Sequence, residues 1–318
     1  MKTSCITLRL VLILFSLSSF AVAREDLSYQ TFQNGDYVKS VDMSAYAPSQ
    51  DASLPTQTFE GYLQLSGNPT FKIINANKYF VPTEEIKQTK TLPTDFNYEF
   101  IQDNDVLIPV KRGPIPSNHT RWEYVLEPGR VWNEPNDNGF SRAAIPFSLI
   151  EKNANCTHNG VLMFLFKTGG EISRVAMQIS SETCYYLQFD AFGLLNASYL
   201  PATIANKQAI ISAYNDEIAQ RLPTRPIASL STDFPSINTE HFAIGNSSGN
   251  TRTGLVFKGI HYTSNCPTRH GNYPYCDALN IPSYSTAKSV TAAIALMRIE
   301  QLFPGTANLP VSKYALNS

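Results

Sequence analysis

The amino-acid sequence predicts an α+β protein: a β-rich N-terminal domain, sandwich or barrel-like, followed by a second unit with strands and a helix. Three observations support this fold class. Short β-prone runs, separated by Gly, Pro and Asn clusters, follow one another from about Thr58 to Asn196. A helix is expected at about residues 204–221, with Thr203 as its N-cap and Pro223 after its end. A small, apolar helix then begins at Ser285, after further strand-like sequence.

The first residues have the pattern of a secretory signal peptide. Lys2 and Arg9 supply a positive start, a short apolar run follows, and Ala21-Val22-Ala23 is a small-x-small cleavage site. The apolar run is too short to indicate a transmembrane helix. We therefore expect an exported protein, periplasmic or secreted, without membrane insertion after the signal is removed.

The remaining chain divides by composition. Residues 24–56 are polar and without periodicity, which indicates an extended lead-in. Residues 57–222 form the β-rich domain with its terminal helix, and residues 223–238, rich in Pro, Ser and Thr, are interpreted as a linker. Residues 239–318 form the last domain, with strand-like runs at 241–245 and 254–262.

Within the β-rich domain, Val161–Phe166 is a continuous apolar run, which is typical of a strand buried on both faces. Val175, Met177 and Ile179 alternate with smaller or polar residues, as expected for one face of a strand.

Four cysteines follow the signal peptide: Cys156, Cys184, Cys266 and Cys276. In an oxidising compartment, an even number favours two disulfides, and proximity in sequence favours 156–184 and 266–276. A zinc site made of Cys266, His270 and Cys276 is the weaker alternative. His158, close to Cys156, is interpreted as a turn residue beside a disulfide. We expect no metal and no organic cofactor.

Charge excludes one class of partner. Without Lys2 and Arg9 the balance is 23 basic against 26 acidic residues, which is 23 − 26 = −3. Such a chain offers no basic patch for nucleic acid. A small molecule, or a peptide or ester substrate, is the expected partner.

Ser285 and Lys288 are the candidate catalytic residues. They form a Ser-x-x-Lys at the start of the apolar helix, where residues three apart share a face. A serine hydroxyl needs a base, and a lysine acts as one when burial or a neighbouring cation lowers its pKa. Because the helix residues 290–297 are mostly apolar, we expect the helix to be buried, Lys288 to be partly desolvated, and free backbone N–H groups to point at Ser285. The alternative is an ordinary capping serine beside a solvated lysine.

Residues 281–316 resemble the penicillin-recognising serine hydrolases, in particular the branch of class C β-lactamases, D-alanyl-D-alanine carboxypeptidases and related esterases. The resemblance lies in Ser285-Thr-Ala-Lys288-Ser-Val-Thr-Ala, in Leu302-Phe-Pro-Gly305 and in Leu309-Pro-Val-Ser-Lys-Tyr-Ala315. It implies a β-lactamase/DD-peptidase-like α/β domain, with Ser285 as acylated nucleophile and an oxyanion donor through its N–H, and Lys288 as base.

The family also has a Tyr-x-Asn element and a Lys-Thr-Gly or His-x-Gly strand downstream of its Ser-x-x-Lys. The chain ends before either, so we expect a truncated catalytic domain with little activity. The function predicted is that of an exported serine hydrolase acting on an amide or ester. The alternative is a non-enzymatic exported binding protein, for cell wall, glycan or a protein partner, with a vestigial hydrolase segment.

Overall fold

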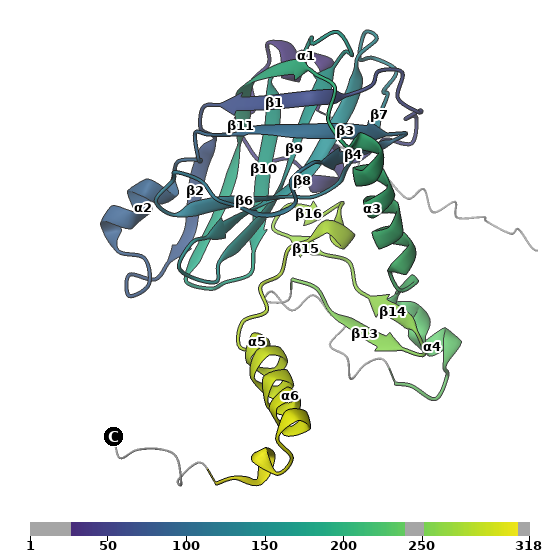
Figure 1. Cartoon of the computed structure of the whole chain (residues 1–318). Coiled ribbons are helices and arrows are strands. Elements are labelled where there is room, and N and C mark those ends of the chain that lie inside the picture. The colour runs from purple at the N-terminus through teal and green to yellow at the C-terminus, as the bar shows by residue number, and fades with distance from the viewer. Residues whose placement is uncertain (1–26, 239–250, 311–318) are drawn as a thin grey trace, which may run out of the picture.

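A large antiparallel sheet forms the body of the protein (Figure 1). The computed structural model describes residues 27–238 and 251–310. The predicted signal peptide and the strand expected at 241–245 therefore lie outside the described residues. Within the described ranges, no helix has both the length and the apolar composition needed to cross a membrane.

The pairings of the sheet close on themselves, because β8 hydrogen-bonds to both β7 and β9. The closed series, in spatial order, is β8 (Ser141–Glu151), β9 (Thr157–Phe166), β10 (Val175–Glu182), β11 (Leu187–Pro201), β1 (Glu60–Ser66), β3 (Asn97–Asp103), β4 (Val106–Pro109) and β7 (Gly129–Trp132). β5 (Gly113–Ile115) and β6 (Trp122–Leu126) extend the sheet from β8, and β2 (Thr70–Ala76) pairs with β11. The β-rich part is thus barrel-like.

Gly129 lets β7 approach β8 closely. A Cβ atom on this residue would lie 1.8 Å from the carbonyl oxygen of Ala144, which no side chain tolerates. The closure of the sheet at this point therefore depends on a glycine.

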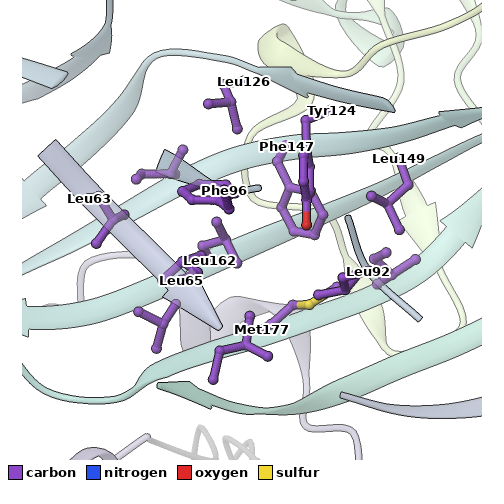
Figure 2. Packing of buried hydrophobic residues seen from close by; sticks show 14 of the residues in the cluster. Leu63, Leu65, Leu92, Phe96, Tyr124, Leu126, Phe147, Leu149, Leu162 and Met177 are labelled. Carbon is purple, nitrogen blue, oxygen red and sulfur yellow. The ribbon is translucent and has the colours of Figure 1, made fainter. Parts of the chain in front are cut away.

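The main core fills the inside of this closed sheet (Figure 2). Side chains from β1, β6, β8, β9 and β10 meet there, among them Leu63, Tyr124, Phe147, Leu162 and Met177. Along β9, Leu162, Phe164 and Phe166 point into this core, since successive side chains of a strand face opposite sides. Val175, Met177 and Ile179 of β10 do the same, as their alternation predicts.

A second core covers the outside of the same strands. Val161, Met163 and Leu165 of β9 belong to it, which confirms that this run is buried on both faces. The covering layer comes from the N-terminal segment and contains α1 (Tyr29–Gln33) and the 3₁₀ turn η1 (Met43–Tyr46). The buried side chains of this segment are Leu27, Phe32, Tyr37, Val41, Met43, Ala45 and Tyr46.

The expectation of an extended lead-in is therefore wrong for the described part of residues 24–56. Gln178 of β10 holds the segment: it accepts from Val41 N at 2.9 Å and donates to Val41 O at 2.8 Å, and Tyr37 donates to it as well. The segment lacks periodicity because, apart from two short helical turns, its backbone is irregular.

Helix α3 (Lys207–Gln220) covers part of the sheet outside β3 and β4, where Ile211 packs with Ile101 and Ile108. It starts later than expected: its N-cap is Asn206, with φ 60°, and not Thr203. The α2 helix (Thr83–Thr89) lies between β2 and β3 in the chain.

The segment 223–238, interpreted from composition as a linker, has regular structure of its own. It contains β12 (Thr224–Pro226), η2 (Ile227–Ser229) and α4 (Leu230–Asp233). β12 pairs parallel with β14 (Ile260–Thr263), which forms a hairpin with β13 (Gly254–Phe257), as expected for 254–262. Ile227 and Leu230 pack on the fully buried Tyr262, so the linker interpretation is wrong here.

Two disulfides confirm the predicted pairing. Cys156–Cys184 joins the residue before β9 to the connection between β10 and β11, with a Cα–Cα distance of 5.2 Å. Cys266–Cys276 spans a segment with β15 (Pro267–Thr268) and β16 (Gly271–Asn272), with a Cα–Cα distance of 5.8 Å. Both distances are ordinary for disulfides.

His158 lies inside β9 and is fully buried, so its interpretation as a turn residue is wrong. Its ring stacks on Phe189 at 4.0 Å, and its Nε2 lies 3.2 Å from the carbonyl oxygen of Leu187. Burial lowers the pKa of His158 to about 3, so the ring is neutral at physiological pH.

Removing the disulfides should destabilise the fold unequally. The sequence separations are 28 and 10, so loop closure assigns the first disulfide about 3–4 kcal/mol and the second about 2–3 kcal/mol. We expect C156A/C184A to lower the free energy of unfolding in urea more than C266A/C276A does. The reverse order would contradict a loop-entropy origin.

Acid should destabilise the fold through His158. The unfolded chain binds a proton at this residue below about pH 6.5, whereas the folded chain does so only near pH 3, so its contribution falls as the pH drops through this window. The difference in unfolding free energy between wild type and H158Q should shrink by about 2 kcal/mol from pH 7 to pH 5. A difference that stays constant over this range would refute the assignment.

Candidate active site

A buried polar network fixes the chain that leads to the candidate nucleophile. The backbone N–H of Asn280 donates to Asn159 Oδ1 at 3.0 Å, and Asn159 Nδ2 donates to Asn280 O at 3.0 Å. The side chain of Asn280 donates to Ser148 Oγ at 3.1 Å. Because Asn159 and Ser148 are buried in β9 and β8, the segment after Asn280 starts from a fixed point on the sheet.

Tyr284 makes a second attachment to the sheet domain. Its hydroxyl donates to the carbonyl oxygen of Thr183, which lies in the connection between β10 and β11. Its backbone has φ 46°, a left-handed conformation that a tyrosine seldom adopts. Ser285 is the next residue along the chain.

Ser285 and Lys288 lie together, as the sequence predicts. Lys288 Nζ is 3.1 Å from Ser285 Oγ. The helix consists of α5 (Thr286–Lys288), the π-helical segment η5 (Ser289–Ala293) and α6 (Ile294–Leu302), and a short turn, η6 (Thr306–Asn308), follows. Ser285 occupies the N-cap position, but its side chain makes no capping hydrogen bond. The oxygen of Ser285 therefore accepts a hydrogen bond from Lys288 Nζ and does not cap the helix end.

The surroundings of the pair differ from the expectation. Ser285 and Lys288 are both exposed, and so is nearly the whole helix, which points away from the sheet (Figure 1). Ile294 is 58% and Met297 70% exposed. The expected burial of the helix and desolvation of Lys288 are wrong, because no element of the described ranges packs on these apolar side chains.

The helix start also offers fewer free donors than expected. The backbone N–H groups of Thr286, Ala287 and Lys288 donate to the carbonyl oxygens of residues 283, 284 and 285. They are therefore not available to an oxyanion at Ser285. The role of the Ser285 N–H itself as a donor stays a prediction.

A pocket of about 300 Å³ lies next to the attachment of Tyr284. Its lining contains Thr183, the residue whose carbonyl oxygen Tyr284 contacts. The full lining is residues 180–185, Gln188, Thr251 and residues 267–269.

Two lining residues of this pocket, Glu182 and Arg269, belong to a cluster of ion pairs. Arg269 binds Glu182 through two nitrogens at 2.7 and 2.9 Å, and its Nε binds Asp190 at 2.7 Å. His270 Nε2 lies 3.2 Å from the second oxygen of Asp190. Burial raises the pKa of Glu182, although Arg269 acts in the opposite direction. Sequence analysis missed this cluster because its members are about 80 residues apart and form no local pattern.

The structure places a different histidine near cysteine sulfurs than the zinc alternative assumed. His270 pairs with Asp190, whereas His158 is the histidine that lies near cysteine sulfurs, those of Cys156 and Cys184. The ligand atoms of these three residues lie within 4.8 Å of one another. Both sulfurs belong to a disulfide, however, and a thiolate is what binds zinc. The zinc site expected as the alternative at Cys266, His270 and Cys276 is also occupied by a disulfide.

Comparison of the chain with protein-family models, with curated proteins and with solved structures found no match. The resemblance to penicillin-recognising serine hydrolases therefore rests on residues 281–316 alone, of which the structure describes those up to 310.

Proposed function

We propose that this chain is an exported serine hydrolase of the β-lactamase-related class, in which Ser285 takes up the acyl group of an amide or ester. One observation carries the proposal: Lys288 Nζ lies 3.1 Å from Ser285 Oγ, and that hydroxyl is not used to cap the helix. A base within hydrogen-bonding distance is the first requirement for a serine nucleophile.

The reaction needs only proton and acyl transfer. The mechanism requires the unprotonated amine of Lys288, which accepts the proton of Ser285 Oγ while this oxygen attacks the carbonyl carbon of the substrate. The tetrahedral intermediate then collapses, the bond to the leaving amine or alcohol breaks, and the ammonium of Lys288 returns the proton to that group. In a second attack, water or another hydroxyl or amine acceptor gives its proton to the amine of Lys288, the bond between the acyl carbon and Ser285 Oγ breaks, and Lys288 returns the proton to Ser285 Oγ.

Exposure of the pair limits the expected rate. Water solvates both side chains, so the low-dielectric surroundings that strengthen such catalysis are lacking among the described residues. Slow acylation without efficient turnover is therefore the expected behaviour of this chain.

Export is supported by two features. The first residues have the signal-peptide pattern, and the cysteines described by the structure form two disulfides, which persist in oxidising compartments.

A non-enzymatic exported binding protein is the second candidate. The exposure of the Ser285 helix favours it, because an apolar helix surface of this kind is typical of an interaction surface. The two candidates differ in a single chemical property, the reactivity of Ser285.

Labelling with a fluorophosphonate tests this reactivity. The wild-type chain should become labelled slowly at Ser285, as peptide mass spectrometry would locate, and S285A should show no labelling at this peptide. K288A should slow the reaction by about 10²-fold, which is the lower range for loss of a general base. K288R should be as slow, since arginine keeps its proton.

S283A is the matched control, because Ser283 is an exposed serine of the same turn. It should be labelled at the wild-type rate. Equal labelling of wild type and K288A would remove the base from the mechanism, and absence of labelling at Ser285 would favour the binding protein. Rapid, stoichiometric labelling by a fluorescent penicillin would contradict the expected low activity.

A further inference from the structure

The charged residues that line the pocket, Glu182 and Arg269, are already paired within a cluster that includes Asp190 and His270. Both oxygens of Glu182 accept hydrogen bonds from Arg269, at 2.7 and 2.9 Å. Of the oxygens of Asp190, one accepts from Arg269 at 2.7 Å and the other lies 3.2 Å from His270. All the carboxylate oxygens of the cluster therefore have partners, and a cationic ligand would have to share these acceptors with Arg269 and His270.

An anionic ligand is disfavoured for a related reason. Two carboxyl groups stand against one guanidinium in this cluster, and Arg269 also donates to the carbonyl oxygen of Phe189 at 2.7 Å. The carboxyl side chains are almost completely buried, 4% and 5% exposed, so solvent screens them poorly. The excess of carboxylates beside the pocket thus disfavours an anionic ligand, and the pairing of these carboxylates with Arg269 weakens their attraction for a cationic one.

Uncharged polar groups of the lining remain for a ligand. Within the described part of the chain, no hydrogen bond engages the hydroxyls of Ser181 and Thr251 or the amide oxygen of Gln188, whose amide nitrogen lies 3.3 Å from Glu182. A hydroxyl both donates and accepts, so these groups match a ligand that carries several hydroxyls or amides.

An aromatic ring lies at the same pocket. Tyr185 is 71% exposed and belongs to the lining. A flat ring supplies apolar contact area at little cost in conformational entropy, which suits the C–H face of a sugar ring. The volume of about 300 Å³ is at the lower end for ligand sites, which fits one or two sugar rings better than a longer chain.

We propose that this pocket binds a neutral saccharide, with Tyr185 against the sugar face and Ser181, Thr251 and Gln188 bonded to its hydroxyls. The assignment does not rest on the reactivity of Ser285. Whether the chain is a hydrolase or a binding protein, sugar binding in this pocket would attach it, together with its Ser285 helix, to a glycan.

Titration of the full chain with monosaccharides tests the proposal. N-acetylglucosamine and glucose are the neutral probes, glucuronate and glucosamine the charged ones, and a neutral acetylated dipeptide amide represents a peptide ligand. Binding is followed by saturation-transfer NMR and by amide chemical shifts. We expect a neutral sugar to bind with a Kd in the millimolar range and to shift signals of the pocket residues.

Y185A should weaken this binding at least about tenfold, and T251A less, while F303A should bind as wild type. Tyr185 and Phe303 are both aromatic and largely exposed, 71% and 65%, so the two substitutions are comparable in their effect on folding. S285A should also bind as wild type, which separates this site from the acylation chemistry.

Three outcomes would overturn the proposal. These are absence of binding by both neutral sugars, equal affinity in wild type and Y185A, or tighter binding of a charged probe or the dipeptide. None of them bears on labelling of Ser285.

Discussion

Burial of β9 on both faces is the constraint on which the rest of the structure depends. Its apolar side chains alternate between the core inside the closed sheet and the core under the N-terminal segment. A strand of this kind is stable only if both layers are present. If either layer were missing, the large apolar side chains on the face that it covers would be exposed to water. The closed sheet and the covering segment are therefore parts of one folding unit.

The first residues of β9 carry polar groups that tie later segments to this unit. Asn159 holds Asn280, and the carbonyl oxygen of Gly160 accepts from Tyr273 at 2.8 Å. Cys266 and Tyr273 are buried in the same outer core as the N-terminal segment. Buried polar groups require partners, so these bonds give the C-terminal segment a defined path over the sheet.

This path links the segment of the candidate nucleophile to the pocket lining through Tyr284. Asn280 attaches the start of the segment that precedes the Ser285 helix, and Tyr284 attaches the end of this segment to Thr183 of the pocket lining. The helix beyond has no comparable attachment among the described residues, and its apolar side chains are exposed. Two residues before Ser285, Asn280 and Tyr284, are thus attached to the sheet domain, whereas the apolar residues after it lack a packing partner in the described part of the chain.

Sequence by itself determined the features that depend on neighbours along the chain. The β-rich class, the two-sided burial of 161–166, the hairpin at 254–262, the disulfide pairing and the approach of Lys288 to Ser285 all follow from local periodicity or short separations. Only the tertiary structure decided what covers each surface. It placed the unpatterned N-terminal segment in a core, put His158 inside a strand, joined Arg269 to Glu182 and Asp190, and left the Ser285 helix exposed. Burial depends on residues that lie tens to hundreds of positions away in the sequence. The pattern of neighbouring residues does not indicate which distant residues will pack on a surface.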